Sequence, residues 1–563
     1  MAGNVELIKE QSRGLRGTIE QSIDDKLTGQ LAKGDQVLIK FHGSYQQDDR
    51  DRRDIRERKK LERAYSFMIR LRIPAGDITA KQFCDLMATC DHYGTGVLKI
   101  TTRQTVQIHG ILKAHLKPTM QDFDKTGLDS IAGCGDVNRN VMASAYPHLS
   151  VAHSEVFDFA AKISEALMPT SQAYSEIWLD GEKLSGEAEH DPLYKTHYLP
   201  RKFKIGIAIP PHNECDIFTQ DIGLIAVIED DKLLGFNIAA GGGMGTTHGN
   251  VKTYPRLATI VGFVTPDRVI DTCAEILMIQ RDFGNRKERT FARLKYTIDK
   301  MGVDHFKAEL EKRLGVKLGP AKPFRFTRRG DIFDIVRDSE GLSYYTLYVE
   351  HGRIVDLPHY KIKTALLEIA AQSYADIRFT GNQNIMLTHV KEIDKPKIEA
   401  ILEKYGIWDS RISRTRQDAL ACVALNTCPL AMAEAQRYLP SLLTKIDALQ
   451  AKYNLSQQAI SVRMTGCPNG CARPYAAEIA FVGKAMGRYD MRLGGDHLGQ
   501  RLNKIFHEGI DEAEILKLLD GYFSDYATDR RQHEAFGDYI HRMHMMTEKT
   551  GKIETHARQL EDA

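Results

Sequence analysis

Two pairs of segments, far apart in the chain, match each other in the same order. LKITTRQTVQIHGI (98–111) matches IRFTGNQNIMLTHV (377–390), and LRIPAGDIT (71–79) matches LYVEHGRIV (347–355) at nearly the same separation. A repeat of this length indicates two fused, related halves and not a solenoid. The sequence therefore predicts a pseudo-twofold molecule, and a site enclosed between the halves is the natural place for a ligand.

The length and the repeat together predict several domains. A chain of 563 residues is too long for a single hydrophobic core. Strand-like alternation and helix-like periods follow one another, which favours an α/β (α+β) fold. GFNIAAGGGMG (235–245) weakly matches YDMRLGGDHLG (489–499), which extends the duplication to a second kind of domain. We expect four parts: a polar N-terminal arm, 1–63; a duplicated domain, 64–145 with 347–420; a first α/β domain with its connector, 146–346; and a second α/β domain, 421–563.

The composition excludes several classes of function. The net charge is +2, so we expect no nucleic-acid partner and no anionic membrane surface, and any cationic site must be local. No apolar run approaches the length of a membrane span, and the first residues lack the apolar stretch of a secretion signal. Nine cysteines form no disulfide framework in so long a chain. The sequence thus favours a reducing, cytoplasmic compartment.

Four of the nine cysteines form two local pairs. Cys422 and Cys428 lie in ACVALNTCPLAMAEA, and Cys467 and Cys471 lie in TGCPNGCARP, whose Pro-Asn-Gly indicates a tight turn. Four thiolates on two such turns suit an iron-sulfur cluster, zinc or a purely structural role. Structural zinc usually has shorter spacers, and a proline next to a cysteine recurs in ferredoxin-type sequences, so the spacing favours the cluster. The other five (Cys84, Cys90, Cys134, Cys215 and Cys273) are expected to be buried, small apolar residues.

Three predicted strands carry cations or amides on one face and apolar side chains on the other. FMIRLRI (67–73) and RKFKIGIAI (201–209) are two of them, and 98–111 is predicted as the third. Their polar faces include Arg70, Arg72, Lys99, Thr101, Arg103, Thr105, Gln107, His109, Lys202 and Lys204. A solvent-facing side of a sheet is often polar, but these faces have almost no Asp or Glu. Guanidinium and ammonium groups without counter-charges favour an anion.

Two further stretches bear on ligand binding. VNRN (137–140) places Arg139 between Asn138 and Asn140 in a turn-like context that suits anion capture. GGGMGTTHGN (241–250) fits neither a dinucleotide fingerprint nor a phosphate-binding loop of ATPases. Its glycines would let the backbone approach a flat ligand closely.

With these residues in place, the chain resembles the sulfite/nitrite reductase haemoproteins. The resemblance rests on TGCPNGCARP with CVALNTCPLA, on NRN, on LPRKFK and on the GGG stretch, and it runs from about residue 12 to about residue 540. FHGSYQQDDRD (41–51) and HGILK (109–113) fit the bacterial subgroup that receives electrons from NADPH through a separate flavoprotein. The resemblance implies ferredoxin-like half-domains plus two sirohaem-binding α/β domains.

The resemblance also implies roles for individual residues. Cys422, Cys428, Cys467 and Cys471 would bind a 4Fe-4S cluster, and Cys471 would also be the axial ligand of a sirohaem iron. Arg70, Arg139, Lys202 and Lys204 match the family's residues for the substrate anion, sulfite. Arg103, Gln107, His109, Asn138 and Asn140 match the surroundings of the sirohaem carboxylates. Cys134 departs mildly from the family pattern and is interpreted as incidental.

The implied activity is the six-electron reduction of sulfite to sulfide by an assimilatory enzyme. No flavin or nicotinamide motif is visible, so NADPH, FAD and FMN would act only through the partner flavoprotein, the α subunit. The charged run DDRDRRDIRERKKLER (48–63) is interpreted as a solvated surface or as part of a docking region for that partner. Two alternatives stay open: a ferredoxin-dependent nitrite reductase of the same fold, and a zinc-stabilised anion-binding module without a redox role.

Overall fold

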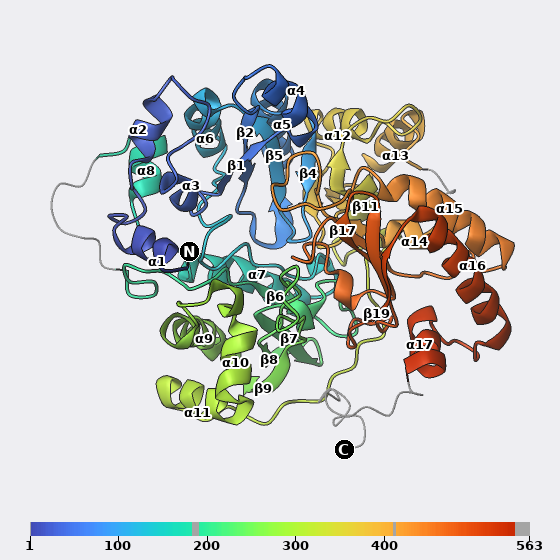
Figure 1. The fold of residues 1–563 in the computed structure, drawn as a ribbon. Coiled ribbons are helices and arrows are strands. Elements are labelled where there is room, and N and C mark those ends of the chain that lie inside the picture. Colours follow the sequence, from blue (N-terminus) through green and yellow to red (C-terminus); the bar gives the residue numbers. More distant parts are fainter. Residues whose placement is uncertain (1, 183–190, 409–411, 546–563) are drawn as a thin grey trace.

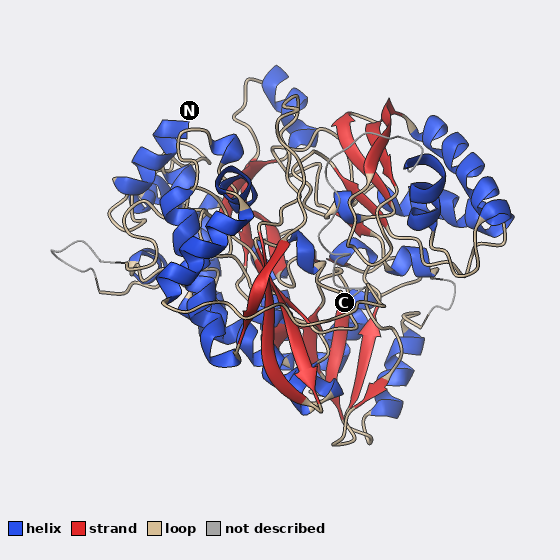
Figure 2. Ribbon diagram, turned by 90° about the horizontal axis from the view of Figure 1, so that it is seen from below, coloured by secondary structure: helices blue, strands red, loops and turns tan. Residues whose placement is uncertain are grey.

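The computed structural model describes residues 2–182, 191–408 and 412–545. The C-terminal 546–563 of the predicted second α/β domain therefore lie outside the described residues. Four sheets form the framework, and helices cover them on the outside (Figures 1 and 2). Among the described residues, no helix has both the length and the apolar character needed to span a membrane.

The predicted repeat is confirmed by two sheets with the same strand order. The first sheet runs β1 (Ser44–Asp48), β2 (Tyr65–Arg70), β5 (Val106–Ile111), β4 (Leu98–Ile100) and β12 (Arg353–Ile354). The second runs β10 (Val336–Arg337), β11 (Ser343–Leu347), β14 (Ile385–Val390), β13 (Asp376–Phe379) and β3 (Asp77–Ile78). Each half thus contributes its short strand, β3 or β12, to the edge of the other half's sheet.

The exchanged strands follow a matching pair of glycines. Gly76 and Gly352 have φ of +79° and +73°. A Cβ on Gly76 would lie 2.4 Å from the carbonyl oxygen of Phe379, and one on Gly352 would lie 2.3 Å from that of Ile100. Only glycine permits this close crossing of the two halves.

The two half-domains carry matching helices on their outer faces. The helices of the two halves are α5 (Ala80–Tyr93) with α6 (Leu116–Lys125), and α12 (Ile362–Ala371) with α13 (Lys395–Lys404). A capping box of Thr79 and Gln82 starts α5, and α5 ends before Gly94. Helices α5 and α12 pack against each other, which joins the halves on this side (Figure 1).

The other two sheets are also related to each other. The first is β6 (Ile205–Ala208), β7 (Ile222–Glu229), β8 (Lys232–Ala240) and β9 (Thr259–Val264). The second is β15 (Leu420–Ala421), β16 (Val462–Thr465), β17 (Ile479–Ala485), β18 (Arg488–Leu493) and β19 (Lys504–Ile510). In both, a parallel pair, β6–β7 or β16–β17, is followed by two antiparallel strands. The weak match between 235–245 and 489–499 therefore marks the ends of equivalent strands, β8 and β18.

Helices flank these two sheets and complete the fold. They are α7 (Val151–Ala166), α8 (Ala173–Trp178), α9 (Val269–Phe283), α10 (Leu294–Met301), α11 (Val303–Leu314), α14 (Arg414–Gln417), α15 (Leu439–Lys452), α16 (Glu512–Asp529) and α17 (Phe536–Ile540). A large hydrophobic core runs through both half-domains and the first α/β domain, from Leu15 to Ile407. The second α/β domain has a core of its own, from Ala419 to Ile540.

Three expectations about local structure were wrong. Residues 98–111 form a hairpin, β4 and β5, and not one strand, because a turn with Gln104 at φ +56° interrupts it. β2 ends at Arg70, and Arg72 instead pairs with Asp129. In 201–209, only Ile205–Ala208 are in a strand, so Lys202 and Lys204 precede it. The connector 319–330 carries only isolated bridges, as its composition predicts.

The N-terminal 1–63 are also not a free arm. They contain α1 (Ala2–Glu10), α2 (Ile19–Asp24), α3 (Asp35–Leu38), β1 and α4 (Arg53–Arg58). β1 is paired with β2, and Ile19, Leu38 and Phe41 are buried in the large core. The charged run is exposed only from Asp51 onward, where α4 lies at the top of Figure 1.

Candidate functional site

The two cysteine pairs are brought together by neighbouring parallel strands. β15 and β16 pair in parallel, so Cys422 follows one strand end and Gly466 and Cys467 follow the other. The amide of Cys422 donates to the carbonyl of Met464 at 3.2 Å, and the amide of Gly466 donates to Cys422 Sγ at 3.3 Å. The predicted tight turn is confirmed, with Gly470 at φ +66° between the second pair of cysteines.

The four thiols form one electrostatic group, here called the four-thiol group (Cys422, Cys428, Cys467 and Cys471). Burial, followed by the neighbouring Cys471, raises the pKa of Cys467 to about 12. Burial and the neighbouring Cys471 likewise raise the pKa of Cys422 and Cys428. When the four thiols lose their protons, the resulting thiolates repel one another. A metal centre displaces these protons and stabilises the thiolates by its positive charge.

Four cysteine thiolates are a donor set that both an iron-sulfur cluster and zinc accept. Among the described residues, no three or more His, Cys, Asp or Glu side chains are arranged to hold a single metal ion. The scattered cysteines are buried as predicted, except that Cys84 is half-buried.

Next to this group, side chains of the first hairpin, β4–β5, take part in a series of hydrogen bonds. With its amide oxygen toward Arg70, Gln107 accepts from Arg70 Nε at 3.0 Å and donates to His109 Nε2 at 3.1 Å. His109 Nδ1 also lies 3.3 Å from Thr427 Oγ1, beside Cys428. Burial, with Lys99 and Arg70 nearby, keeps the pKa of His109 well below its usual value, so its ring is neutral.

Arg70 and Arg139 are both held by the turn at 133–135. Arg139 Nε donates to the carbonyl of Gly135 at 2.8 Å and Nη1 to that of Gly133 at 3.1 Å. Arg70 Nη1 lies 3.4 Å from the Gly133 carbonyl and from Cys134 Sγ. Cys134, which the sequence left without a role, therefore contacts one of the predicted substrate residues.

Lys202 and Lys204 lie together without neutralising partners. Neither ammonium group makes a hydrogen bond or ion pair with another described residue. Burial, followed by the charge of Arg201, lowers the pKa of Lys202 to about 7, and Cys471 opposes this shift. Burial, followed by the charge of Lys202, lowers the pKa of Lys204 well below its usual value. Lys202 is thus close to both the four-thiol group and the cations, and free ammonium groups of this kind bind anions and release protons readily.

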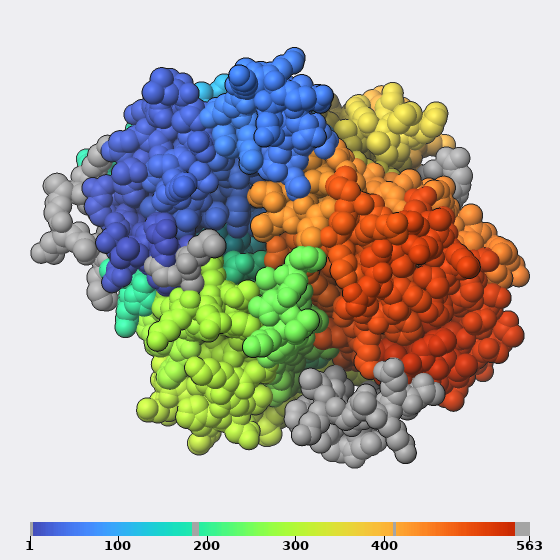
Figure 3. Space-filling view, viewed as in Figure 1, coloured from blue at the N-terminus to red at the C-terminus, as the bar shows by residue number. Residues whose placement is uncertain are grey.

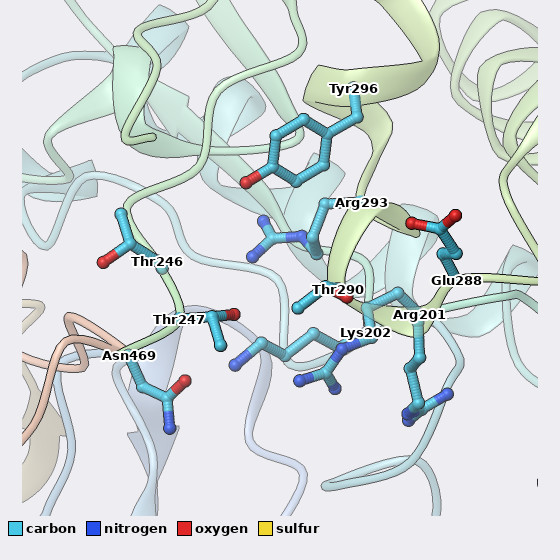
Figure 4. A pocket seen from close by; sticks show the side chains of 11 residues that line it. Arg201, Lys202, Thr246, Thr247, Glu288, Thr290, Arg293, Tyr296 and Asn469 are labelled. Carbon is cyan, nitrogen blue, oxygen red and sulfur yellow. The ribbon is translucent and has the colours of Figure 1, made fainter. Parts of the chain in front are cut away.

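Lys202 lines a cavity of about 410 Å³. Its lining includes Arg201, Lys202, Arg289, Arg293 and Asn469 of the cysteine turn, with the hydroxyls of Thr246, Thr247 and Thr290. Figure 4 shows Lys202 and Arg293 extending toward Thr246, Thr247 and Asn469. The lining comes from the central and C-terminal parts of the chain, which lie against each other in the surface view (Figure 3).

Several atoms in this region are buried with no hydrogen-bond partner among the described residues. They include Arg103 Nε, although Arg103 Nη2 donates to the carbonyl of Ile205 at 2.9 Å, and Asn138 Oδ1. A buried guanidinium N–H without an acceptor fits a carboxylate of a bound group. Asn140 differs, because its amide is bonded to the backbone of Ile73, Arg103 and Gln104. The structure therefore places Asn140 where it holds the Arg103 turn and not where it faces a ligand.

Sequence reasoning missed Arg293, Arg289, Arg201 and Lys295. Arg293 lines the cavity and pairs with buried Asp221 at 2.8 Å, and Lys295 Nζ donates to the carbonyl of Gly245 at 2.8 Å. The Gly-rich stretch contacts the cysteine turn directly, since the amide of Thr246 donates to the carbonyl of Pro468 at 2.9 Å. These residues lie at helix starts and in loops, where no alternating pattern marks them.

Two family models match the chain. The model described as "Nitrite/Sulfite reductase ferredoxin-like half domain" matches residues 59–125 and 336–405, the two related half-domains. The model described as "Nitrite and sulphite reductase 4Fe-4S domain" matches residues 159–318. That match covers the first α/β domain, whereas the four-thiol group lies in the related second one, so the match reflects the duplication.

Curated relatives match nearly the full chain. Proteins named "Sulfite reductase [NADPH] hemoprotein beta-component" are 54% identical in Leptospira biflexa, over 96% of this chain and 98% of the relative. Those of Staphylococcus saprophyticus and Geobacillus kaustophilus are 50% and 49% identical, over 97% and 98% of this chain and 96% and 97% of theirs. The solved structure of Mycobacterium tuberculosis NirA shares the fold, with a TM-score of 0.73, 24% identity and 95% of each chain covered.

Proposed function

This chain belongs to the nitrite and sulphite reductase family, and from this premise we propose that it is the haemoprotein subunit of an assimilatory NADPH-dependent sulfite reductase. It reduces sulfite to sulfide with a 4Fe-4S cluster and a haem-type cofactor. The observation that carries the proposal is that Asn469, in the turn between Cys467 and Cys471, lines the same cavity as the unpaired cation Lys202. The proposed redox centre and the proposed anion site are therefore next to each other.

We assign the haem-type cofactor to sirohaem. Sirohaem is rich in carboxylates, and the cavity offers guanidinium groups at Arg201, Arg289 and Arg293. Outside the cavity lining, Arg103 Nε is buried with no hydrogen-bond partner among the described residues. Cys422, Cys428, Cys467 and Cys471 would hold the cluster, and Cys471, the exposed one of the four, would also reach the sirohaem iron. When bound, these groups supply the electrons and the site for the sulfur atom.

The protein's own residues bind the anion and deliver protons. Arg70 and Arg139 are fixed by the 133–135 turn, so they present their charge without reorganising. Each oxygen that leaves sulfite must be protonated to depart as water. Lys202, with its pKa lowered to about 7, is placed to give up such protons at neutral pH, and Lys204 lies beside it.

The electrons would come from a flavoprotein partner that uses NADPH, and the protein would act in the cytoplasm. We place the docking region in the exposed part of the charged run, 51–63. It is tethered to the four-thiol group, because the amide of Arg50 donates to the carbonyl of Asn426 at 3.0 Å and Asn426 Nδ2 donates to Asp49 Oδ1 at 2.8 Å.

The first test is an absorption spectrum of the purified protein, with iron, acid-labile sulfide and zinc measured on the same sample. The pigment is extracted and identified by mass spectrometry. We expect a haem-type spectrum, iron with sulfide, and the mass of sirohaem. A colourless protein that holds zinc would contradict the proposal.

The second test compares sulfite and nitrite as substrates with a reduced viologen as the donor. We expect the higher kcat/KM with sulfite. A clear preference for nitrite, with activity from ferredoxin and none from an NADPH flavoprotein, would favour the nitrite reductase alternative.

A further inference from the structure

Asp216 is a buried carboxylate that pairs with three guanidinium groups. Its side chain is 1% exposed, and it accepts from Arg329 Nε at 2.7 Å, from Arg463 Nη1 at 2.6 Å and from Arg473 Nε at 2.5 Å. These three arginines hold the pKa of Asp216 far below its usual range, so it stays ionised. They come from the connector, from β16 and from the end of the cysteine turn.

Asp216 and Arg473 occupy equivalent places in the two related α/β domains. Asp216 precedes the 3-10 helix Ile217–Thr219, between β6 and β7, and Arg473 precedes the 3-10 helix Pro474–Ala476, between β16 and β17. Both residues have left-handed backbones, with φ of 46° and 53°. Opposite charges at equivalent positions therefore join the two domains directly.

Arg473 uses its remaining donors on the hairpin turns of both half-domains. Nη1 donates to the carbonyl of Thr102 at 2.7 Å, and Nη2 donates to that of Gly381 at 2.9 Å. Thr102 Oγ1 in turn donates to the carbonyl of Cys471 at 2.8 Å. The chain from Cys471 to Arg473 is thus held at both ends against the turn that carries Arg103.

We propose that Asp216 is a positioning residue for Cys471, because it fixes Arg473 and thereby the turn that presents this thiol to the cavity. The inference rests on the proposed function, in which Cys471 serves both the cluster and the tetrapyrrole. Removing the carboxylate leaves three guanidinium groups unbalanced and frees Arg473 from its anchor. The Cys471 sulfur then loses its fixed place relative to the haem pocket.

The test compares the full-length holoproteins of wild type and Asp216→Asn. Tetrapyrrole and iron are measured per folded protein, with the absorption spectrum, the EPR spectrum and the rate of pigment loss to an excess of apomyoglobin. We expect about 10- to 100-fold faster pigment loss in D216N, the range for lost supporting contacts around a metal ligand, and an altered spectrum. Glu176→Gln, which breaks the Arg16–Glu176 ion pair far from the cysteine turn, is the matched control and should keep wild-type spectra.

A second variant covers the case in which D216N does not fold. Thr102→Val removes only the hydroxyl that bonds the Cys471 carbonyl, and Thr126→Val removes an equivalent bond, to the Phe123 carbonyl, elsewhere. We expect T102V to shift the spectrum and speed pigment loss, and T126V to do neither.

Two outcomes separate the inference from the function on which it rests. Wild-type spectra and pigment retention in T102V, and in D216N where it folds, would overturn the positioning role while leaving the enzyme assignment intact. A wild-type protein without any tetrapyrrole would instead remove the proposed function.

Discussion

Gly470 and Gly487 have the same left-handed backbone, with φ of +66° in both, but only Gly470 is enclosed. A Cβ on Gly470 would lie 2.9 Å from Tyr475 Cε2 and 3.2 Å from the Met244 carbonyl, whereas one on Gly487 would meet nothing within 4 Å. The cysteine turn is therefore packed between the Gly-rich stretch and the following 3-10 helix.

This pair gives a matched test of the turn. Gly487→Ala should cost only the backbone penalty of a left-handed alanine, about 1 kcal/mol. Gly470→Ala adds a steric clash beside Cys467 and Cys471, so we expect it to lose most of its iron and labile sulfide. The measurement is metal content per folded protein, with thermal unfolding of both variants. Equal iron in the two variants would show that the enclosure of Gly470 has no bearing on the cluster.

Arg50 is predicted to protect the cluster. Its Nη1 donates to the carbonyls of Cys428, at 3.3 Å, and of Ala431, and its positive charge lowers the pKa of Cys428 against the effect of burial. In Arg50→Ala, we expect about 10-fold faster loss of iron in air and a more negative cluster potential, because a nearby positive charge favours the reduced state. An EPR-monitored redox titration measures the potential.

The control for this prediction is the exposed neighbour Arg52. Among the described residues, its side chain makes no hydrogen bond or ion pair with the cysteine-bearing segments 422–428 and 467–471. Arg52→Ala should therefore keep the wild-type potential. An R50A protein with wild-type potential and iron retention would contradict the assignment.

The parts of the fold that could be predicted are those whose sequence carries a recognisable pattern. The repeat was visible because Gly76 and Gly352, and Gln104 and Gln383, keep matching backbones in both halves. The hairpin in 98–111 was hidden because Lys99 pairs with Gln107, so alternation continues in register across the turn. The N-terminal segment was misjudged because a few buried apolar residues, such as Ile19 and Phe41, are outnumbered by polar ones.

The parts of the candidate site that could be predicted lie in short stretches with a distinctive chemistry. The parts that form only when distant segments pack together could not be predicted. Arg70, Lys202 and Lys204 were found because their stretches lack counter-charges, and the four cysteines because of their turns. The Asp221–Arg293 pair was missed, since its members are 72 residues apart and neither belongs to a motif. The role of Asn140 was also beyond sequence reasoning, because its position beside Ile73 and Arg103 arises only from the fold.

Docking of the electron donor is predicted to depend on the basic residues of the charged run. Deleting 1–60 would be a poor test, since it removes β1 and part of the core. The triple variant Arg58→Glu, Lys59→Glu, Lys60→Glu changes only exposed side chains. We expect NADPH-driven turnover with the flavoprotein to fall by about 10-fold or more, because complementary charge chiefly sets the rate of association. Turnover with a reduced viologen should be unchanged.

Lys300→Glu with Lys312→Glu is the control for this variant. These exposed lysines lie at α10 and α11, at the opposite end of the molecule in Figure 1. Charge reversal there should leave NADPH-driven turnover at the wild-type level. Equal losses in the two variants would mean that net charge, and not the charged run, governs the encounter. Wild-type turnover in the triple variant would move the docking region elsewhere.

Lys202 is predicted to set the alkaline limb of the pH profile. Its pKa is lowered to about 7, so the ammonium form exists below that pH and is lost above it. The carboxylates of a bound tetrapyrrole would favour the charged form, so kcat/KM for sulfite, which reports the enzyme before sulfite binds, should decline from pH 7 or somewhat above. Lys202→Arg keeps its charge throughout this range. We therefore expect a lower kcat in this variant, since arginine gives up no proton, but no decline up to about pH 9.

The ionisation of sulfite itself affects both enzymes equally, so the difference between the two profiles, measured with a viologen donor from pH 6 to 9.5, isolates Lys202. Superimposable profiles would assign the proton to another group, with Lys204 the next to test.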